Sequence, residues 1–245
     1  MEITNDTYII SPSIMCARSL LNIKSDIDVF IKNGIKMIHV DIMDNHFVSN
    51  LVFGPDIVNE LVEYREKSNK DFIIDVHMMV ENPLSLLPRM KLSNCDYVTI
   101  HAEIQKDNIK NTIEYLHERN IHAGIAINPN TSITVLQPWL DDIDLVLFMF
   151  VEPGFKGARP VQKVINKIKS FNINIYKEHN NILKAVDGGI TLERAQECKN
   201  CGVNIYIGGT SSLYKKNTNK LSNKELEQNI VKINFIINNI VKTNE

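Results

Sequence analysis

Short apolar segments alternate with helical patterns along this chain, and that alternation restricts its fold more than any other feature. Eight segments are typical of strands, and they recur about every 30 residues, the usual length of a strand–helix–strand unit. Most are almost continuously apolar, as in parallel strands that are buried on both faces. They comprise residues 8–14, 37–42, 72–78, 97–100, 122–127, 145–151, 182–186 and 205–207.

Helical patterns fill the intervals between the predicted strands. Apolar residues three and four positions apart predict the first helix, and Gly34 is typical of the residue that ends one. Pro83 is suited to the first turn of the third helix, whereas Thr191 opens the seventh and Gly202 closes it. A final apolar stripe predicts a C-terminal helix over about residues 221–242, packed on the core.

Eight strand–helix units in 245 residues match a single (β/α)8 barrel, or TIM barrel, which typically needs about 250 residues. An open doubly wound sheet is the alternative, but eight parallel strands without a second domain favour a closed barrel. No low-complexity linker divides the chain, so we expect one domain over residues 1–245. In such a barrel the active site lies at the C-terminal ends of the strands.

The charge balance and composition exclude several kinds of partner. The 27 basic and 29 acidic side chains give a net charge of −2, which argues against nucleic acid binding. The longest apolar run, residues 145–151, is far shorter than the roughly 20 residues needed to cross a membrane. The N-terminus lacks the basic region of a secretory signal, and the four cysteines then indicate reduced thiols in a cytoplasmic protein.

Polar side chains stand at the ends of three predicted strands. His39 and Asp41 end the second strand two residues apart and so share one face, while His77 and Asp187 end the third and seventh strands. The first pair by itself is also compatible with a buried hydrogen bond. Together the four residues form a nitrogen and oxygen donor set that suits zinc first, or iron(II), manganese or cobalt. We therefore expect one divalent metal ion at the mouth of the barrel.

Other polar residues near these strand ends carry weaker signals. Asp75 precedes His77 by two residues, and we expect it to orient the His77 ring. We expect His101, at the end of the fourth strand, to line the mouth, and His46 to shape the site from its loop. Cys198-Lys-Asn-Cys201 has the spacing of a redox or zinc pair, but without a second pair a structural role is favoured.

Glycine-rich segments follow the last two strands, where this fold usually binds phosphate. Gly188 and Gly189 follow the seventh strand, and Gly209 and Thr210 follow the eighth. Their amides can approach phosphate oxygens, and we expect a short helix from Thr210 to direct its positive end at the anion. Residues 152–157, after the sixth strand, suit either a mobile lid or an ordinary turn.

Longer motifs occur in order from about Ile10 to Tyr214, and through them the chain resembles the ribulose-phosphate 3-epimerase family. They are Ser11-Pro-Ser13, His39-Val-Asp-Ile-Met-Asp44, His46-Phe-Val48, Asp75-Val-His-Met-Met79, Val151-Glu-Pro-Gly-Phe155 and Val186-Asp-Gly-Gly189. The resemblance implies a TIM barrel of the ribulose-phosphate-binding type and a homo-oligomer. It also implies an isomerase that uses a divalent metal to invert C3 of a ketose phosphate through a cis-enediolate.

The resemblance also implies roles for individual residues. The metal ligands would be His39, Asp41, His77 and Asp187, with Asp41 and Asp187 also forming the acid/base pair. The implied substrate contacts are Ser13, His77, Met43, Met79 and Met149. The implied phosphate and lid residues are Gly154, Phe155, Lys156, Gly157, Gly188, Gly189, Gly209 and Thr210.

The chain departs from the family pattern near the site. Asn45 replaces a usual glycine, and Phe150 stands where threonine is common. Lys156 occupies the place of a small residue, and Ala158-Arg159 replaces a habitual Gly-Gln step. These changes leave the four expected ligands intact, but they bear on substrate length, lid behaviour and turnover.

Residues 11–16, 20–24 and 209–213 look closer to the allulose-6-phosphate 3-epimerase branch of the family. This likeness favours D-allulose 6-phosphate and D-fructose 6-phosphate as the substrate pair. The alternative pair is D-ribulose 5-phosphate and D-xylulose 5-phosphate, the substrates of a pentose phosphate pathway epimerase.

Three other functions are less well supported. A Schiff-base aldolase needs a strand-end lysine, but Lys36 and Lys184 lie near strand beginnings and Lys156 lies in a loop. Phosphate-barrel decarboxylases and hexulose-phosphate synthases use Asp-x-Lys-x-x-Asp, whereas the second strand here reads His-Val-Asp-Ile-Met-Asp. A sugar-phosphate-binding regulatory protein would keep the glycines and lose acids or ligands, and all four expected ligands are present.

Overall fold

Nine strands form the central sheet of the computed structural model, which describes residues 3–4, 6–154, 160–175, 179–214 and 221–239. They are β1 (Ile9–Pro12), β2 (Met37–Asp44), β3 (Leu51–Val52), β4 (Ile73–Met79), β5 (Tyr97–His101), β6 (His122–Ile127), β7 (Leu145–Met149), β8 (Leu183–Asp187) and β9 (Ile205–Gly208). The strand order is β1-β9-β8-β7-β6-β5-β4-β2-β3. All neighbours pair in parallel except β3, which pairs antiparallel with β2.

The sheet closes on itself between its first and second strands. A parallel bridge joins Ser13, which follows β1, to His39 in β2. With β3 as a short added hairpin strand, the remaining strands match the expected (β/α)8 barrel and not the open doubly wound alternative. The fold prediction is therefore confirmed.

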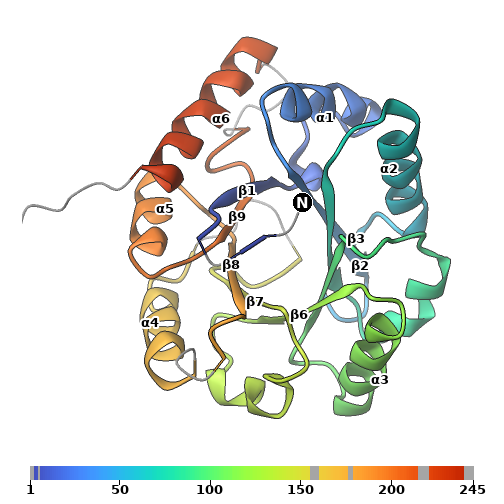
Figure 1. The fold of residues 1–245 in the computed structure, drawn as a ribbon, viewed down its shortest axis with the longest axis vertical. Coiled ribbons are helices and arrows are strands. Elements are labelled where there is room, and N and C mark those ends of the chain that lie inside the picture. Colours follow the sequence, from blue (N-terminus) through green and yellow to red (C-terminus); the bar gives the residue numbers. More distant parts are fainter. Residues whose placement is uncertain (1–2, 5, 155–159, 176–178, 215–220, 240–245) are drawn as a thin grey trace, which may run out of the picture.

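Helices surround the barrel (Figure 1). The α-helices are α1 (Ile23–Lys32), α2 (Pro55–Ser68), α3 (Lys106–His117), α4 (Val164–Asn174), α5 (Leu192–Lys199) and α6 (Asn223–Asn238). Five 3₁₀ helices complete the described helical segments: η1 (Ile14–Cys16), η2 (Leu20–Asn22), η3 (Pro83–Ser85), η4 (Leu87–Arg89) and η5 (Ile133–Trp139).

The expectation of an α-helix opened by Pro83 was wrong. Pro83 instead opens η3, and Pro88 lies within η4, so this connection consists of two short 3₁₀ turns. Pro138 lies inside η5 in the same way. Proline has no amide hydrogen to donate and clashes with the preceding turn, so these segments do not extend into regular α-helices.

The predicted helix ends agree better with the structure. Gly34 follows α1 with a φ of 77°, and the Thr191 side chain accepts a hydrogen bond from the Arg194 amide at the start of α5. The final helix spans Asn223–Asn238, inside the predicted range of about 221–242. A capping box between Ser222 and Glu225 starts it, and the extended backbone of Asn239 ends it.

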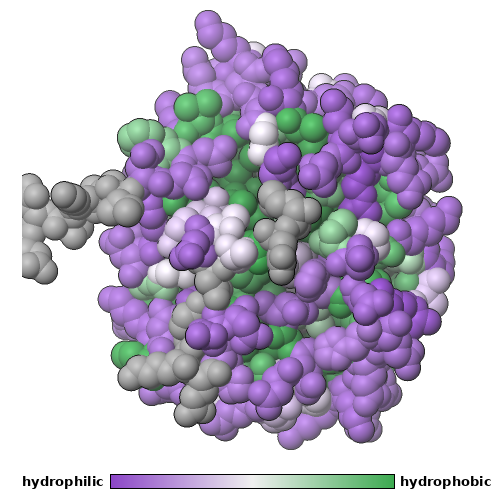
Figure 2. Space-filling view, viewed as in Figure 1, coloured by the Kyte–Doolittle hydropathy of each residue, from purple (hydrophilic) through white to green (hydrophobic). Residues whose placement is uncertain are grey.

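Hydrophilic residues cover most of the face in Figure 2, with hydrophobic residues visible in the gaps between them. Among the described residues, no helix combines the length and apolar character that crossing a membrane requires.

The side chains that point into the barrel are apolar on one side and polar on the other. Apolar side chains of β7, β8 and β9 pack against one another inside the barrel. They also contact an apolar layer at the N-terminal ends of the strands, formed by Ile3, Met37, Ile73 and Tyr97. On the other side of the interior, β1 with the residue that follows it, β2, β4 and β5 contribute polar side chains that are almost completely buried: Ser11, Ser13, His39, Asp41, Asp75, His77, Thr99 and His101. Such a concentration of buried polar groups needs mutual hydrogen bonds, and it places the candidate site on this side of the barrel.

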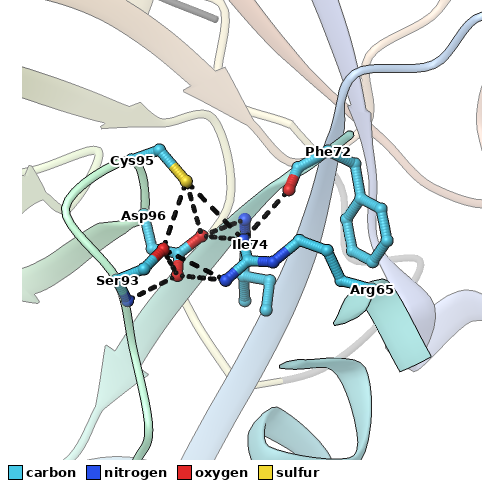
Figure 3. A network of polar contacts seen from close by, with 6 residues as sticks. All are labelled: Arg65, Phe72, Ile74, Ser93, Cys95 and Asp96. Atoms are coloured by element: carbon cyan, nitrogen blue, oxygen red, sulfur yellow. Dashed lines mark hydrogen bonds and ion pairs between the residues drawn. The ribbon is translucent and has the colours of Figure 1, made fainter. Parts of the chain in front are cut away.

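At the N-terminal ends of the strands, a buried ion pair joins α2 to β4 and β5 (Figure 3). Arg65 of α2 donates to both carboxylate oxygens of Asp96, at 2.6 and 3.0 Å, and to the carbonyl of Phe72 at 3.0 Å. Asp96 also accepts hydrogen bonds from the amides of Ile74 in β4 and Ser93. This network holds the starts of β4 and β5 against α2, far from the strand ends that carry the candidate site.

Candidate active site

Three strands bring four potential metal ligands together at the C-terminal end of the barrel. His39 and Asp41 come from β2, His77 from β4 and Asp187 from β8, and one ligand atom from each lies within 4.8 Å of the others. Among the residues that the structure describes, this is the one group of three or more such side chains placed to hold a metal ion. Two imidazoles and two carboxylates are a donor set that binds zinc and other divalent transition metals.

Asp41 is the centre of this cluster. Its Oδ1 atom lies 3.2 Å from His39 Nε2 and 3.3 Å from His77 Nδ1. Its Oδ2 atom accepts a 2.6 Å hydrogen bond from the hydroxyl of Ser13. Each imidazole therefore directs one ring nitrogen at the cluster and leaves its other nitrogen for a different partner.

The partner of Asp75 differs from the expected one. Asp75 lies opposite His39 in the register of β2 and β4, and its Oδ2 atom is 2.7 Å from His39 Nδ1. The hydroxyl of Ser11 donates to the same oxygen at 3.2 Å. The expectation that Asp75 orients His77 was wrong, because the pairing of the strands places Asp75 beside the ring on the neighbouring strand.

His77 is supported instead by His101. The Nε2 atoms of the two rings are 2.8 Å apart, and His101 Nδ1 lies 3.0 Å from Glu103 Oε2. His101 is completely buried, with the tilted Phe47 ring packed against it at 4.6 Å between centroids, so it does not line the open mouth as expected. Sequence reasoning did not identify Glu103, although its position two residues after a strand-end histidine was a usable signal. His46 is exposed, and its amide and its Nδ1 atom contact Asp44 at the end of β2.

Burial and charge separate the pKa values of the two site carboxyls. Burial acts to raise the pKa of Asp41, but the His39 charge and hydrogen bonds from His39 and His77 outweigh it and hold that pKa well below its usual range. Burial raises the pKa of Asp187, and the negative charge of Asp41 raises it further. Burial acts to lower the pKa of His39, yet Asp75 and Asp41 raise it well above its ordinary value. The protein thus favours an ionised Asp41 next to an Asp187 that holds its proton more tightly.

A cavity opens beside these carboxyls. Ser13, Asp41 and Asp187 line it, together with the three methionines expected there, Met43, Met79 and Met149. Pro153 and Ser211, from the expected lid and phosphate segments, also line it, and further lining residues that the sequence did not assign to a site are Met15, Cys16, Val151, Ile190 and Ile207. The cavity therefore combines titratable groups with apolar side chains, an arrangement typical of a small-molecule site.

Glycine loops form the other side of the cavity, which Gly154, Gly188, Gly189, Gly209 and Thr210 line. Gly188 and Gly189 have φ values of 96° and 61°, a backbone conformation that favours glycine. The segment after Gly209 is a turn, in which the amide of Leu213 donates to the Gly209 carbonyl at 3.0 Å, so the short helix expected from Thr210 was wrong. Phe155, Lys156 and Gly157 lie outside the described residues.

Two of the departures from the family pattern lie among the described residues. Asn45 has a φ of 58°, and asparagine tolerates this left-handed conformation better than most other residues, so it can replace a glycine here. Phe150 is completely buried, and the Arg194 guanidinium lies 5.3 Å from its ring centroid. Lys156 and Ala158-Arg159 lie outside the described residues.

None of the four cysteines forms a disulfide among the described residues, and Cys198 and Cys201 are both buried at the end of α5. Burial raises the pKa of the Cys198 thiol well above its ordinary value, which suppresses the reactive thiolate. These observations agree with the structural role expected for this pair.

A closed parallel barrel, with donor side chains and glycine loops at the strand ends, defines a TIM-barrel enzyme. The family model described as "Ribulose-phosphate 3 epimerase family" matches residues 9–213. The chain belongs to this family, and it is therefore an enzyme of the isomerase class.

Relatives named ribulose-phosphate 3-epimerase cover most of the chain. The protein from Buchnera aphidicola subsp. Baizongia pistaciae is 36% identical over 204 residues, which are 83% of this chain and 88% of the relative. The protein from Bacillus subtilis is 34% identical over 220 residues, which are 89% of this chain and 97% of the relative. A relative from Encephalitozoon cuniculi is 36% identical over 172 residues, covering 70% of this chain and 73% of its own length.

Solved structures support the fold alone. The 3-hexulose-6-phosphate synthase of Salmonella typhimurium has a TM-score of 0.60 and 13% identity, covering 92% of this chain and 99% of its own. The thiamine phosphate pyrophosphorylase of Pyrococcus furiosus has a TM-score of 0.58 and 14% identity, covering 94% of this chain and 98% of its own.

Proposed function

We propose that the chain interconverts D-ribulose 5-phosphate and D-xylulose 5-phosphate by inverting C3, with a divalent metal as cofactor. The observation that carries the proposal is the cluster of two imidazoles and two carboxylates within 4.8 Å. The names of the relatives support the five-carbon substrate pair. Residues 11–16, 20–24 and 209–213 favour D-allulose 6-phosphate as the alternative substrate. We also infer a homo-oligomer, on the family resemblance.

The metal would be held by His39, Asp41, His77 and Asp187, whose donor atoms suit zinc, iron(II), manganese or cobalt. When bound, the metal supplies a Lewis acid that stabilises negative charge developing on the C2 and C3 oxygens of the sugar. Asp75 contacts the ring nitrogen of His39 that points away from the cluster, and His101 contacts the corresponding nitrogen of His77. The other nitrogen of each ring faces the cluster and remains available as a ligand.

Inversion at C3 requires two proton-transfer groups on opposite faces of the sugar. The Asp41 carboxylate removes the C3 proton, and the C–H electron pair forms the C2–C3 double bond of a cis-enediolate as the carbonyl oxygen gains charge. The Asp187 carboxylic acid then delivers a proton to C3 from the other face. The low pKa of Asp41 and the raised pKa of Asp187 support this order, and the reverse reaction exchanges the two roles.

The walls of the cavity support binding of a sugar phosphate. Met43, Met79 and Met149 surround the carboxyls with polarisable apolar surface, which excludes water from the planar intermediate. Gly188, Gly189 and Gly209 lie at the ends of β8 and β9, where their amides can approach a phosphate group.

The Asp187→Asn variant tests the proton transfer. Wild-type enzyme loaded with metal should exchange the C3 hydrogen of D-ribulose 5-phosphate with deuterated water. The variant should lose epimerisation by about 100-fold or more, because it cannot supply the second proton, whereas metal-loaded variant should still exchange the C3 hydrogen through Asp41. NMR follows both reactions, and the metal content of both proteins is measured as a control. Undiminished epimerisation in the variant would remove Asp187 from the mechanism.

Parallel turnover assays test the substrate. Metal-stripped and reconstituted enzyme is given D-ribulose 5-phosphate and D-allulose 6-phosphate at equal concentrations. We expect activity only after reconstitution and a higher kcat/KM for the pentulose phosphate. A preference for the hexulose phosphate would support the alternative substrate, and inactivity on both would refute the epimerase proposal.

A further inference from the structure

We propose that His101 and Glu103 are positioning residues that fix the ring orientation and tautomer of His77 for metal binding. The proposal rests on the proposed metal-dependent function. It concerns a chain of three side chains, His77, His101 and Glu103, which runs from the candidate metal cluster through the end of β5 to the loop that follows β5.

The distances define a continuous hydrogen-bonded chain. His77 Nε2 lies 2.8 Å from His101 Nε2, and His101 Nδ1 lies 3.0 Å from Glu103 Oε2. Both rings are completely buried, so water does not replace either contact. A 2.8 Å contact between two imidazole nitrogens requires one to donate a proton and the other to accept it.

Metal binding selects one assignment of these protons. His77 Nδ1 faces Asp41 at 3.3 Å, and it must be unprotonated to act as a ligand. The neutral ring then carries its proton on Nε2 and donates it to His101 Nε2. His101 consequently carries its own proton on Nδ1 and donates it to the carboxylate of Glu103. Each hydrogen bond in the chain therefore favours the tautomer of His77 that can bind metal.

Glu103 is itself held in place. Its Oε1 atom accepts hydrogen bonds from the Asn128 amide at 2.8 Å and from the Thr131 hydroxyl at 2.5 Å. Burial acts to raise the pKa of Glu103, but its hydrogen bond from His101 and its other donors lower it overall, which keeps the acceptor charged. The anchored carboxylate thus gives the chain a fixed acceptor at its outer end.

The two imidazoles of the cluster have different supports. His39 Nδ1 contacts the Asp75 carboxylate directly at 2.7 Å, whereas His77 reaches a carboxylate only through the intervening His101. Substitutions at positions 101 and 103 should therefore affect His77 and leave the support of His39 intact.

The experiment measures cobalt(II) affinity by competition with a chelator and records the visible absorption spectrum of the bound ion. Glu103→Ala and His101→Leu should weaken affinity by about 10- to 100-fold and alter the spectrum. Glu103→Gln should restore most of the affinity, because its amide oxygen still accepts from His101. His122→Leu is the matched control, since His122 stacks on Tyr97 at the other end of the barrel, and it should bind like wild type.

Wild-type affinity and spectrum in folded Glu103→Ala would overturn the proposal. Because Glu103 lies near the surface, this variant decides the question if the buried His101→Leu substitution prevents folding. Failure of the wild-type protein to bind cobalt(II) or to epimerise would instead refute the proposed function. If wild-type protein binds and reacts while the 101 and 103 variants are unchanged, only the positioning role is refuted.

Discussion

Single residues with a positive φ mark the places where this fold most restricts the side chain. At Gly188 the φ is 96°, and a Cβ atom would lie 2.5 Å from Val151 Cγ2. At Gly34 the φ is 77°, and a Cβ atom would meet no atom within 4 Å. Comparing substitutions at these two glycines therefore separates the cost of backbone strain from the cost of steric overlap.

Alanine at these two positions should destabilise the protein to different extents. Gly34→Ala should lower the free energy of unfolding by about 1–2 kcal/mol, the cost of the left-handed conformation. Gly188→Ala should lose more, about 3 kcal/mol, because Val151 must also move. Urea unfolding followed by circular dichroism measures both values, and equal losses would show that the overlap with Val151 contributes nothing.

Among the secondary-structure elements, α2 offers a clear comparison of buried and exposed ion pairs. The Arg65 side chain is 12% exposed and bonds to Asp96, which is fully buried, whereas Lys67 is 77% exposed and pairs with Glu63 at 2.7 Å. Removing one partner of a buried pair leaves an uncompensated charge, while an exposed pair is screened by water.

Substitutions in α2 test this difference. Arg65→Ala should lower the free energy of unfolding by about 3–5 kcal/mol, because Asp96 would remain buried and charged. Lys67→Ala, on the same helix, should change it by less than about 1 kcal/mol. Chemical denaturation of both variants checks the prediction, and a small loss for Arg65→Ala would mean that water or other donors compensate Asp96.

For the whole molecule, buried phenols link stability to alkaline pH. Tyr214 is completely buried, and its hydroxyl has no hydrogen-bond partner among the described residues. Burial raises its pKa well above the ordinary value near 10. Above pH 10 the unfolded chain loses this proton while the folded protein retains it, so the contribution of Tyr214 makes stability fall as pH rises.

The Tyr214→Phe variant should lack the loss of stability above pH 10 that the Tyr214 hydroxyl causes. At pH 7 its free energy of unfolding should equal or exceed that of wild type, because an unpaired buried hydroxyl is removed. Above pH 10 the free energy of unfolding of the variant should exceed that of wild type by a growing amount. Tyr206→Phe should lose about 1 kcal/mol at pH 7, since the Tyr206 hydroxyl donates to the Val203 carbonyl, but show the same alkaline trend. A difference from wild type that is independent of pH would contradict the prediction.

Local sequence patterns were sufficient to predict the eight main strands and the barrel they form. Each strand is a short apolar run buried on both faces, a signal contained in the run itself. The two-residue strand β3, Leu51–Val52, was missed because so short a segment has no periodicity and forms only through pairing with β2. Prolines inside the connections, such as Pro88 and Pro138, limited two expected helices to 3₁₀ turns.

The sequence by itself determined which donor residues stand at the strand ends, because alternation along a strand sets the face of each side chain. Only the tertiary structure decided which of them touch. Strand register placed Asp75 against His39, and closure of the barrel brought Asp187 of β8 to the ligands on β2 and β4. The support of His77 by His101 and Glu103 likewise depends on the neighbouring strand. Such partners are set by distances through space, which the order of residues along the chain does not encode locally.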